Sequence, residues 1–148
     1  MEKPLVLLAD DNEATCTLIQ ALLRSDFVVD VASDGREAID KLKSRHYAAI
    51  LLDLLMPVAD GYAVLDHLTA ERPDLLRRVL VVTASLSPRE LQRVREYSIR
   101  AVIAKPFEVS VLQNAVRECA SFRGEPFLAA PFLSGGMILL LADLLRRV

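Results

Sequence analysis

The chain has 148 residues, which is enough for one domain with a substantial core and leaves little room for a second. Its formal net charge is −2 and its sequence pI about 5.7, so we expect no direct nucleic-acid partner. Cys16 and Cys119 lack Cys-x-x-Cys spacing, which predicts reduced core thiols rather than a disulfide or a metal site.

Short apolar runs rich in Val, Ile and Leu recur along the chain, and each precedes a stretch with helical spacing. Apolar runs that alternate with helices predict a parallel β-sheet covered on both faces. The five predicted strands are residues 5–9, 27–32, 48–52, 79–83 and 101–104. The first run begins directly after residues 1–4, which show no export pattern, and we therefore expect a cytoplasmic protein.

Two of the predicted helices carry clear start signals. Asp34 precedes Glu37 by three residues, and Ser87 precedes Glu90 by three, which is the spacing of a capping box. Pro88 adds a residue that is favoured at the first helical position. Apolar residues at three- and four-residue steps predict the buried faces: Leu18, Ile19 and Leu22; Ala38, Ile39 and Leu42; Leu91, Val94 and Tyr97; and, in a fifth helix over 108–121, Val109, Leu112, Val116 and Cys119.

The alternation of strands and helices ends near residue 121, so we divide the chain into a domain over 1–121 and a C-terminal extension over 122–148. Within the extension, residues 126–142 carry no charge, and 137–148 predict an apolar helix with arginines near its carboxyl end. An apolar helix needs burial, so we expect it to pack on the domain or to pair with a second subunit as a homodimer. Docking on another protein, membrane attachment, and a disordered or frame-shifted tail are the alternatives. Pro131 and two glycines argue against a membrane span.

Polar side chains stand where four of the predicted strands end. They are Asp10 and Asp11 after the first, Asp53 after the third, Thr83 at the end of the fourth and Lys105 after the fifth. Open α/β sheets bind ligands outside the carboxyl ends of their strands. A phosphoryl group moving onto a carboxylate gathers negative charge, so its site requires a cation and positive donors. Carboxylates with Mg²⁺, a lysine and a hydroxyl donor satisfy that requirement.

Each of these residues also has an ordinary structural explanation. Asp10 and Asp11 could cap the first helix, and Asp53 could start a turn. Thr83 could be an ordinary β-branched strand residue, and Lys105 a lysine of a surface loop. Chance does not readily explain four such strand ends on one edge, so the combination favours a phosphoryl-transfer site.

The ordered motifs resemble those of the receiver domain of two-component response regulators, of the chemotaxis-regulator type. The motifs are Asp10-Asp11, Asp53 with Met56-Pro57 and Gly61, Thr83-Ala84, and Lys105-Pro106-Phe107. The resemblance covers about residues 4–121. It implies an α/β, flavodoxin-like, doubly wound fold in which five parallel strands take the order 2-1-3-4-5 among five helices, followed here by the apolar extension.

The resemblance implies that Asp53 accepts a phosphoryl group from a sensor histidine kinase or a histidine phosphotransfer protein. It also implies a Mg²⁺ site. Asp11, Asp53 and the carbonyl of Leu55 would bind the ion directly, and Asp10 would bind it through water.

Thr83 would be the switch hydroxyl and Lys105 the lysine that pairs with the phosphoryl group, joined to Pro106 by a cis bond. One family feature is absent. The position three before Lys105, often aromatic and coupled to the threonine, is Val102. Output would then rest on Thr83 and loop movement. The apolar Leu55 gives an attacking water no side-chain help, which predicts a long-lived phosphoryl group.

No output domain fits into residues 122–148, so the sequence predicts a single-domain response regulator. It would signal by altered binding of a downstream protein target that the sequence does not name. It would be no enzyme beyond catalysing its own phosphoryl transfer and dephosphorylation. One alternative is an interaction or scaffold domain that keeps the fold without phosphorylation. Another is a phosphatase or mononucleotide-binding protein. The loop 10–13 argues against it, because this loop is acidic and lacks the glycines that let backbone amides bind phosphate.

Overall fold

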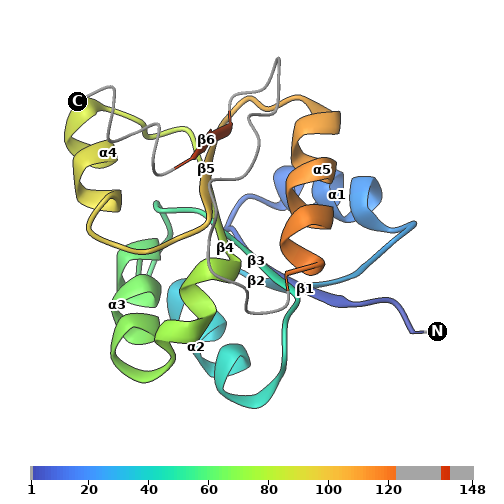
Figure 1. Ribbon diagram of the computed structural model, residues 1–148, viewed down its shortest axis with the longest axis horizontal. Coiled ribbons are helices and arrows are strands. Elements are labelled where there is room, and N and C mark those ends of the chain that lie inside the picture. Colours follow the sequence, from blue (N-terminus) through green and yellow to red (C-terminus); the bar gives the residue numbers. More distant parts are fainter. Residues whose placement is uncertain (1, 123–137, 141–148) are drawn as a thin grey trace.

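The computed structural model describes residues 2–122 and 138–140, which form one sheet with helices on both faces (Figure 1). The strands are β1 (Leu5–Ala9), β2 (Val28–Ala32), β3 (Ala49–Leu52), β4 (Val79–Thr83), β5 (Ala101–Ala104) and β6 (Ile138–Leu140). The helices are α1 (Glu13–Leu23), α2 (Gly35–Ser44), α3 (Gly61–Glu71), α4 (Pro88–Val94) and α5 (Val109–Ala120), with a 3-10 helix, η1, over Pro73–Arg78. Strands β1 to β5 are parallel in the predicted order 2-1-3-4-5, which confirms the predicted fold class.

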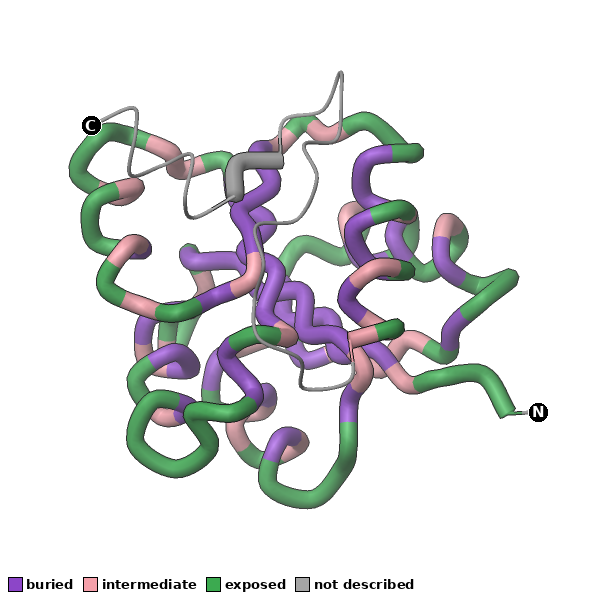
Figure 2. Tube along the Cα trace, viewed as in Figure 1, coloured by how far each residue is buried: buried purple, intermediate pink, exposed green. Residues whose placement is uncertain are grey.

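The core lies in two layers, one on each face of the sheet. Because strand side chains alternate between faces, Val6 and Leu8 of β1 pack with α1 and α5, whereas Leu7 and Ala9 pack with α2, α3 and α4. Figure 2 shows the buried strands as a continuous stretch through the centre of the molecule. Burial on both faces explains why the strands of this sheet read as uninterrupted apolar runs.

Both predicted helix starts are confirmed, although neither is a complete capping box. Asp34 accepts a hydrogen bond from the Glu37 amide at 2.8 Å, and Ser87 accepts one from the Glu90 amide at 3.2 Å. The Glu37 carboxylate bonds the amide of Ser33, one residue before the cap. The Glu90 carboxylate accepts from a side chain of α3 instead of returning to its own helix. The cap residues were therefore predicted correctly, and the reciprocal bonds were not.

The predicted buried faces are wrong at two positions. Leu18 of α1 is 49% exposed and Val109 of α5 is 45% exposed. In α1 the stripe that meets the sheet is Cys16, Ile19 and Leu23, so Leu18 is turned about 100° away from Ile19. Val109 is the first residue of its helix, and the buried face begins only two residues later.

Residues 138–140 of the C-terminal extension differ from the predicted helix. They form β6, which pairs antiparallel with β5 from Ala101 opposite Leu140 to Ile103 opposite Ile138. A short apolar run fits a strand as well as a helix, and the outer edge of β5 offers free backbone groups. The helix prediction is wrong for these three residues. The rest of 123–148 lies outside the described residues, as does the homodimer expected through it.

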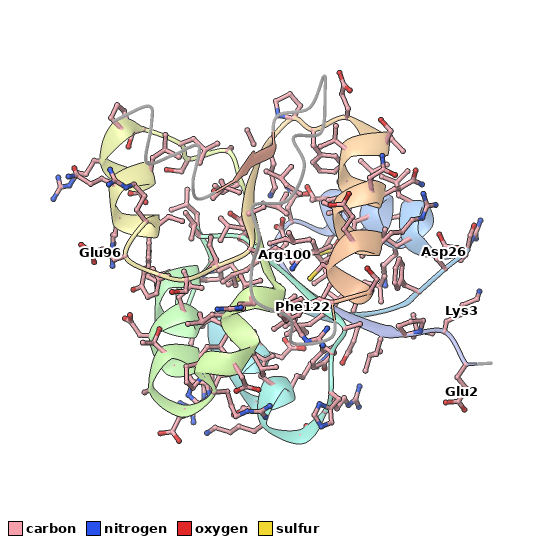
Figure 3. The ribbon with its side chains drawn as sticks, viewed as in Figure 1. Glu2, Lys3, Asp26, Glu96, Arg100 and Phe122 are labelled. Carbon is pink, nitrogen blue, oxygen red and sulfur yellow. The ribbon has the colours of Figure 1, made fainter. Side chains whose placement is uncertain are left out.

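The last helix is tied to the amino ends of the central strands through Phe122, which follows α5. The Arg78 guanidinium donates to the carbonyls of Ala48 and Phe122, both at 3.0 Å. The guanidinium carbons of Arg78 and Arg100 lie 5.5 Å and 5.4 Å from the centre of the Phe122 ring, and Figure 3 labels Arg100 and Phe122 side by side. This arginine and phenylalanine contact fixes the end of α5 at the edge of the sheet opposite Asp53.

Cys16 and Cys119 are both buried, as predicted, and burial raises the pKa of each thiol to about 11. Among the described residues, no helix is both long and apolar enough to cross a membrane.

Candidate functional site

Backbone hydrogen bonds of the sheet continue through the residues that end the strands. The Asp10 amide donates to the Ala32 carbonyl at 3.0 Å, and the Asp53 amide donates to the Ala9 carbonyl at 2.9 Å. The Lys105 amide donates to the Thr83 carbonyl at 2.9 Å. The polar residues are thus held by the strands themselves rather than by flexible loops, which fixes their side chains at one edge of the sheet.

Lys105 joins two of the predicted carboxylates. Its ammonium nitrogen lies 2.6 Å from Asp10 Oδ2 and 3.2 Å from Asp53 Oδ2. Asp10 is 3% exposed and Asp53 8%, while the Lys105 side chain keeps 19% of its surface exposed. The explanation of Lys105 as a solvated loop lysine is therefore wrong, because its charge is turned into the site.

Opposing influences act on the pKa of Lys105. Burial lowers it, since a charged ammonium loses solvation. The hydrogen bond that Lys105 donates to Asp10 and the negative charges of Asp53 and Asp10 raise it, and together they outweigh the burial. The net effect is a raised pKa, so the lysine keeps its positive charge at neutral pH.

Asp11 completes a cluster of three carboxylates that fits a divalent cation. One carboxylate oxygen from each of Asp10, Asp11 and Asp53 lies within 4.8 Å of the other two. Asp11 is exposed, so the cluster is open to solvent on that side. Hard oxygen ligands that leave room for water are what Mg²⁺ prefers. Three carboxylates beside one lysine also leave net negative charge, which a divalent cation would offset.

Neither Asp10 nor Asp11 caps the first helix. Asn12 is the N-cap of α1, and its side chain accepts from the Thr15 amide at 2.9 Å. Asp10 Oδ1 instead accepts from the Asn12 amide at 2.9 Å, which fixes its carboxylate next to the strand end. Capping therefore does not account for Asp10 or Asp11. An Asn directly before the helix was the available signal for the true cap.

Thr83 is completely buried, and its hydroxyl oxygen accepts from the Ser85 amide at 3.2 Å. Ala84 between them is exposed and adds almost no bulk at this edge. The hydroxyl of Thr83 is therefore linked through Ser85 to the loop that leads into α4. At the neighbouring strand end, the peptide bond between Lys105 and Pro106 is cis, as predicted.

The loop between β3 and α3 packs tightly against the backbone of Asp53. The Gly61 amide donates to the Leu54 carbonyl at 3.0 Å, and a Cβ on Gly61 would lie 2.4 Å from the Asp53 carbonyl oxygen. Only glycine fits here. Leu55 is 60% exposed and its amide donates to Asp53 Oδ1 at 3.3 Å. The proposed metal-binding role of the Leu55 carbonyl stays a prediction.

An open pocket of about 400 Å³ adjoins the cluster on the side of α1 and β2. Its lining includes Asp10, Asp11 and Glu13. Acidic walls repel an anionic ligand unless a cation is also present. The pocket is therefore unfavourable for direct binding of a free phosphate.

Comparison with known proteins identifies this arrangement. The sequence profile of the response regulator receiver domain matches residues 6–117. The chain belongs to the receiver domain family of two-component response regulators.

The receiver is similar to parts of longer regulators. It is 30% identical over 141 residues to the regulatory protein VanRB of Enterococcus faecalis, covering 93% of this chain and 61% of that protein. It is 31% identical over 114 residues to the transcriptional regulatory protein ZraR of Escherichia coli, covering 76% of this chain and 25% of that protein. Because these relatives are longer than the chain, the predicted single-domain organisation stays a prediction.

Solved structures agree with the fold and provide a comparison for the metal. The receiver domain of the sensor histidine kinase PA1611 from Pseudomonas aeruginosa is 30% identical, has a TM-score of 0.69 and covers 82% of this chain and 100% of that one. That domain has a magnesium ion coordinated in its active site cleft. The non-phosphorylated HemR receiver of Leptospira biflexa has the same fold, with 24% identity, a TM-score of 0.74, and coverage of 85% of this chain and 100% of that one.

Proposed function

We propose that this receiver accepts a phosphoryl group on Asp53 from a sensor histidine kinase or a histidine phosphotransfer protein, with Mg²⁺, and signals through altered partner binding. The observation that carries the proposal is the contact of Lys105 with both Asp10 and Asp53 inside a cluster of three carboxylates. A cation bound to carboxylates at a strand end is unusual for a purely structural tie, because apolar packing would cost less.

The reaction is a displacement at phosphorus. An oxygen of the Asp53 carboxylate attacks the phosphorus atom of the donor, the bond from phosphorus to the donor's imidazole nitrogen breaks, and that nitrogen keeps the electron pair. The product is a mixed anhydride on Asp53. Lys105 holds positive charge beside the oxygen that reacts and is already turned toward it, so little reorganisation is needed.

Asp10, Asp11 and Asp53 would hold the Mg²⁺, with the Leu55 carbonyl as a further ligand. The bound ion supplies charge compensation for the phosphoryl oxygens. The protein's own part is to keep three carboxylates together at one sheet edge, and the backbone bonds of Asp10 and Asp53 to the strands hold two of them there.

Thr83 provides the route from the phosphoryl group to the surface. Its hydroxyl accepts from the Ser85 amide, and donating its own proton to a phosphoryl oxygen would draw it toward Asp53. Because Ser85 lies in the loop before α4, such a movement would shift that loop. The acyl phosphate carries about two negative charges in place of the single charge of the Asp53 carboxylate, which is enough to bias an equilibrium between two loop positions.

The remaining parts of the proposal concern its setting. We place the receiver in the cytoplasm, where it would recognise a downstream protein and not nucleic acid. It would catalyse no reaction beyond its own phosphorylation and dephosphorylation. The apolar Leu55, with its exposed side chain, favours a long-lived phosphoryl group, because it offers no base to an attacking water.

Acetyl phosphate tests the central claim without the kinase. The wild-type protein, Asp53→Asn and Asp26→Asn are incubated with acetyl phosphate and Mg²⁺, and the intact mass is measured. We expect one phosphoryl group on the wild type and none on Asp53→Asn, which has lost the nucleophile. Asp26→Asn is the matched control, because Asp26 is an exposed carboxylate paired with Arg117 on the surface. It should react like the wild type.

A chelator should abolish the addition to the wild type, since three carboxylates without a cation repel the donor. A phosphoryl group that still appears on Asp53→Asn would show that another residue is modified. No addition with any phosphodonor would favour the scaffold alternative.

A further inference from the structure

Helices α3 and α4 are joined by a group of polar and aromatic side chains, which we call the α3–α4 clamp. It consists of Tyr62 and Asp66 of α3, Glu90 and Arg93 of α4, and Tyr97 after α4. The Tyr62 hydroxyl donates to the Glu90 carboxylate, and the Tyr97 hydroxyl donates to Asp66. The guanidinium carbon of Arg93 lies 3.5 Å from the centre of the Tyr62 ring. The two tyrosine rings are 6.4 Å apart and tilted by 38°.

The Tyr62 to Glu90 bond is partly buried and the Tyr97 to Asp66 bond is exposed, so the first is the stronger of the two. Tyr62 is 4% exposed and packs in the core on this face of the sheet. Burial and the neighbouring carboxylate raise the pKa of Tyr62, and the same influences raise that of Tyr97 to about 12. Both hydroxyls therefore remain donors at neutral pH.

One end of the clamp is fixed to the backbone of the phosphorylation site. Tyr62 follows Gly61, whose amide bonds the Leu54 carbonyl and whose Cα faces the Asp53 carbonyl too closely for any side chain. The position of Tyr62 is therefore set by the strand end that carries Asp53.

The other end of the clamp lies on the element that Thr83 would move. Glu90 is in the first turn of α4, and its amide bonds the capping Ser87. Only residues 84–87 separate Thr83 from this helix. The Tyr62 to Glu90 bond thus connects a fixed point beside Asp53 with the start of α4.

Position 102, which is often aromatic in the family, is a valine here, and the α3–α4 clamp supplies aromatic residues instead. Val102 is completely buried and belongs to the same core as Tyr62 and Val94. A buried valine there has neither a hydroxyl nor a ring to follow Thr83. Among the described residues, the hydroxyl of Tyr62 bonds Glu90 of α4, and the hydroxyl of Tyr97, which follows α4, bonds Asp66 of α3.

We propose that the α3–α4 clamp holds α4 in the position of the unphosphorylated receiver and so opposes the movement that begins at Thr83. The inference rests on the proposed function, because it concerns how phosphorylation of Asp53 is transmitted. A contact that exists in only one of two positions shifts the equilibrium by its own free energy. Loss of the Tyr62 to Glu90 bond should therefore favour the second position of α4 about tenfold, the effect of losing one hydrogen bond to a charged group.

The experiment compares Tyr62→Phe with Tyr47→Phe. Tyr47 is a matched control, because it is 5% exposed and its hydroxyl also donates to a carboxylate at 2.6 Å, but this carboxylate is Asp30 of β2 and not a residue of α4. Amide hydrogen exchange of the α4 peptide is followed before and after treatment with acetyl phosphate and Mg²⁺, with intact mass measured on the same samples.

We expect α4 in unphosphorylated Tyr62→Phe to exchange about tenfold faster than in the wild type, and phosphorylation to add little further change. In the wild type and in Tyr47→Phe, phosphorylation itself should produce most of the increase. Glu90→Ala should reproduce the result from the α4 side, and the double variant should add nothing to either single one, because both remove the same bond.

Equal α4 exchange in wild-type protein and Tyr62→Phe would overturn the clamp, as would an equal increase in Tyr47→Phe. These outcomes are distinct from a failure of the proposed function. That failure would appear as absence of a phosphoryl group on the wild type in the mass spectrum, and the signalling role of the clamp would fall with it.

Discussion

A cation ties strands together at both edges of the sheet, but the two ties bind different atoms. At the carboxyl edge, Lys105 contacts the side-chain carboxylates of Asp10 and Asp53. At the amino edge, Arg78 contacts the backbone carbonyls of Ala48 and Phe122. Carbonyl oxygens neither titrate nor accept a phosphoryl group, whereas carboxylates do both. The same kind of cross-strand contact is therefore structural at one edge and chemically useful at the other.

Charge separates the two edges further. At the carboxyl edge three carboxylates surround one lysine, so the arrangement gains from an added cation. At the amino edge the arginine is matched to neutral carbonyls and to the face of an aromatic ring, and it needs no further partner. The difference predicts opposite consequences when each cation is removed.

The largest expected effect is that of Lys105→Ala on phosphorylation. Removing the only positive side chain that contacts Asp53 in the described part of the chain should slow uptake from acetyl phosphate about 100-fold, as for other donors that stabilise a transition state. The rate is measured by intact mass over time. Lys41→Ala is the matched control, because Lys41 binds Asp30 at 2.8 Å away from the site. A rate within threefold of the wild type, or an equal loss in Lys41→Ala, would remove the special role given to the carboxyl edge.

Arg78→Ala should lower the stability of the protein and leave its phosphorylation unchanged, the reverse of what we expect for Lys105→Ala. Loss of its two hydrogen bonds and its contact with the Phe122 ring should lower the free energy of unfolding by about 2 kcal/mol, with phosphorylation unchanged in the folded protein. Urea denaturation measures the first quantity and intact mass the second. Arg100→Ala should cost less, because its described hydrogen bond is a single contact of 3.5 Å. The comparison would break down if Arg78→Ala impaired phosphoryl uptake as strongly as Lys105→Ala.

The carboxyl edge could be predicted from the sequence because its residues are coupled to the strand pattern. Each of Asp53, Thr83 and Lys105 follows or ends an apolar run, and parallel strands bring such positions to one edge. The helix starts at Asp34 and Ser87 could be predicted in the same way, because the residues that mark them are close together in the chain. These features depend on neighbours in the chain, where residue type and spacing carry the signal.

The amino edge and the α3–α4 clamp could not be predicted, because they join residues far apart in the chain that no strand-end or capping pattern marks. Arg78 and Phe122 are 44 positions apart, and Tyr62 and Glu90 are 28 apart. Nothing in the local pattern distinguishes Tyr62 from an ordinary core aromatic residue. The prediction that Leu18 is buried was wrong for a related reason. Periodicity gives the apolar face of a helix, but the packing angle decides which side of that face is covered.

The smallest effect concerns strain at the carboxyl edge. Val58, in the loop that follows Asp53, has a φ of 66° and is 82% exposed. A β-branched residue is disfavoured in this left-handed region, whereas Asn tolerates it. Val58→Asn should therefore raise the free energy of unfolding by about 1 kcal/mol, measured by urea denaturation. The same change at Val109, which is also exposed but lies in the right-handed conformation of α5, should give no gain. A gain at both positions would mean that the effect comes from replacing an exposed apolar side chain with a polar one. A gain at Val58 alone would show that the loop after Asp53 holds conformational strain.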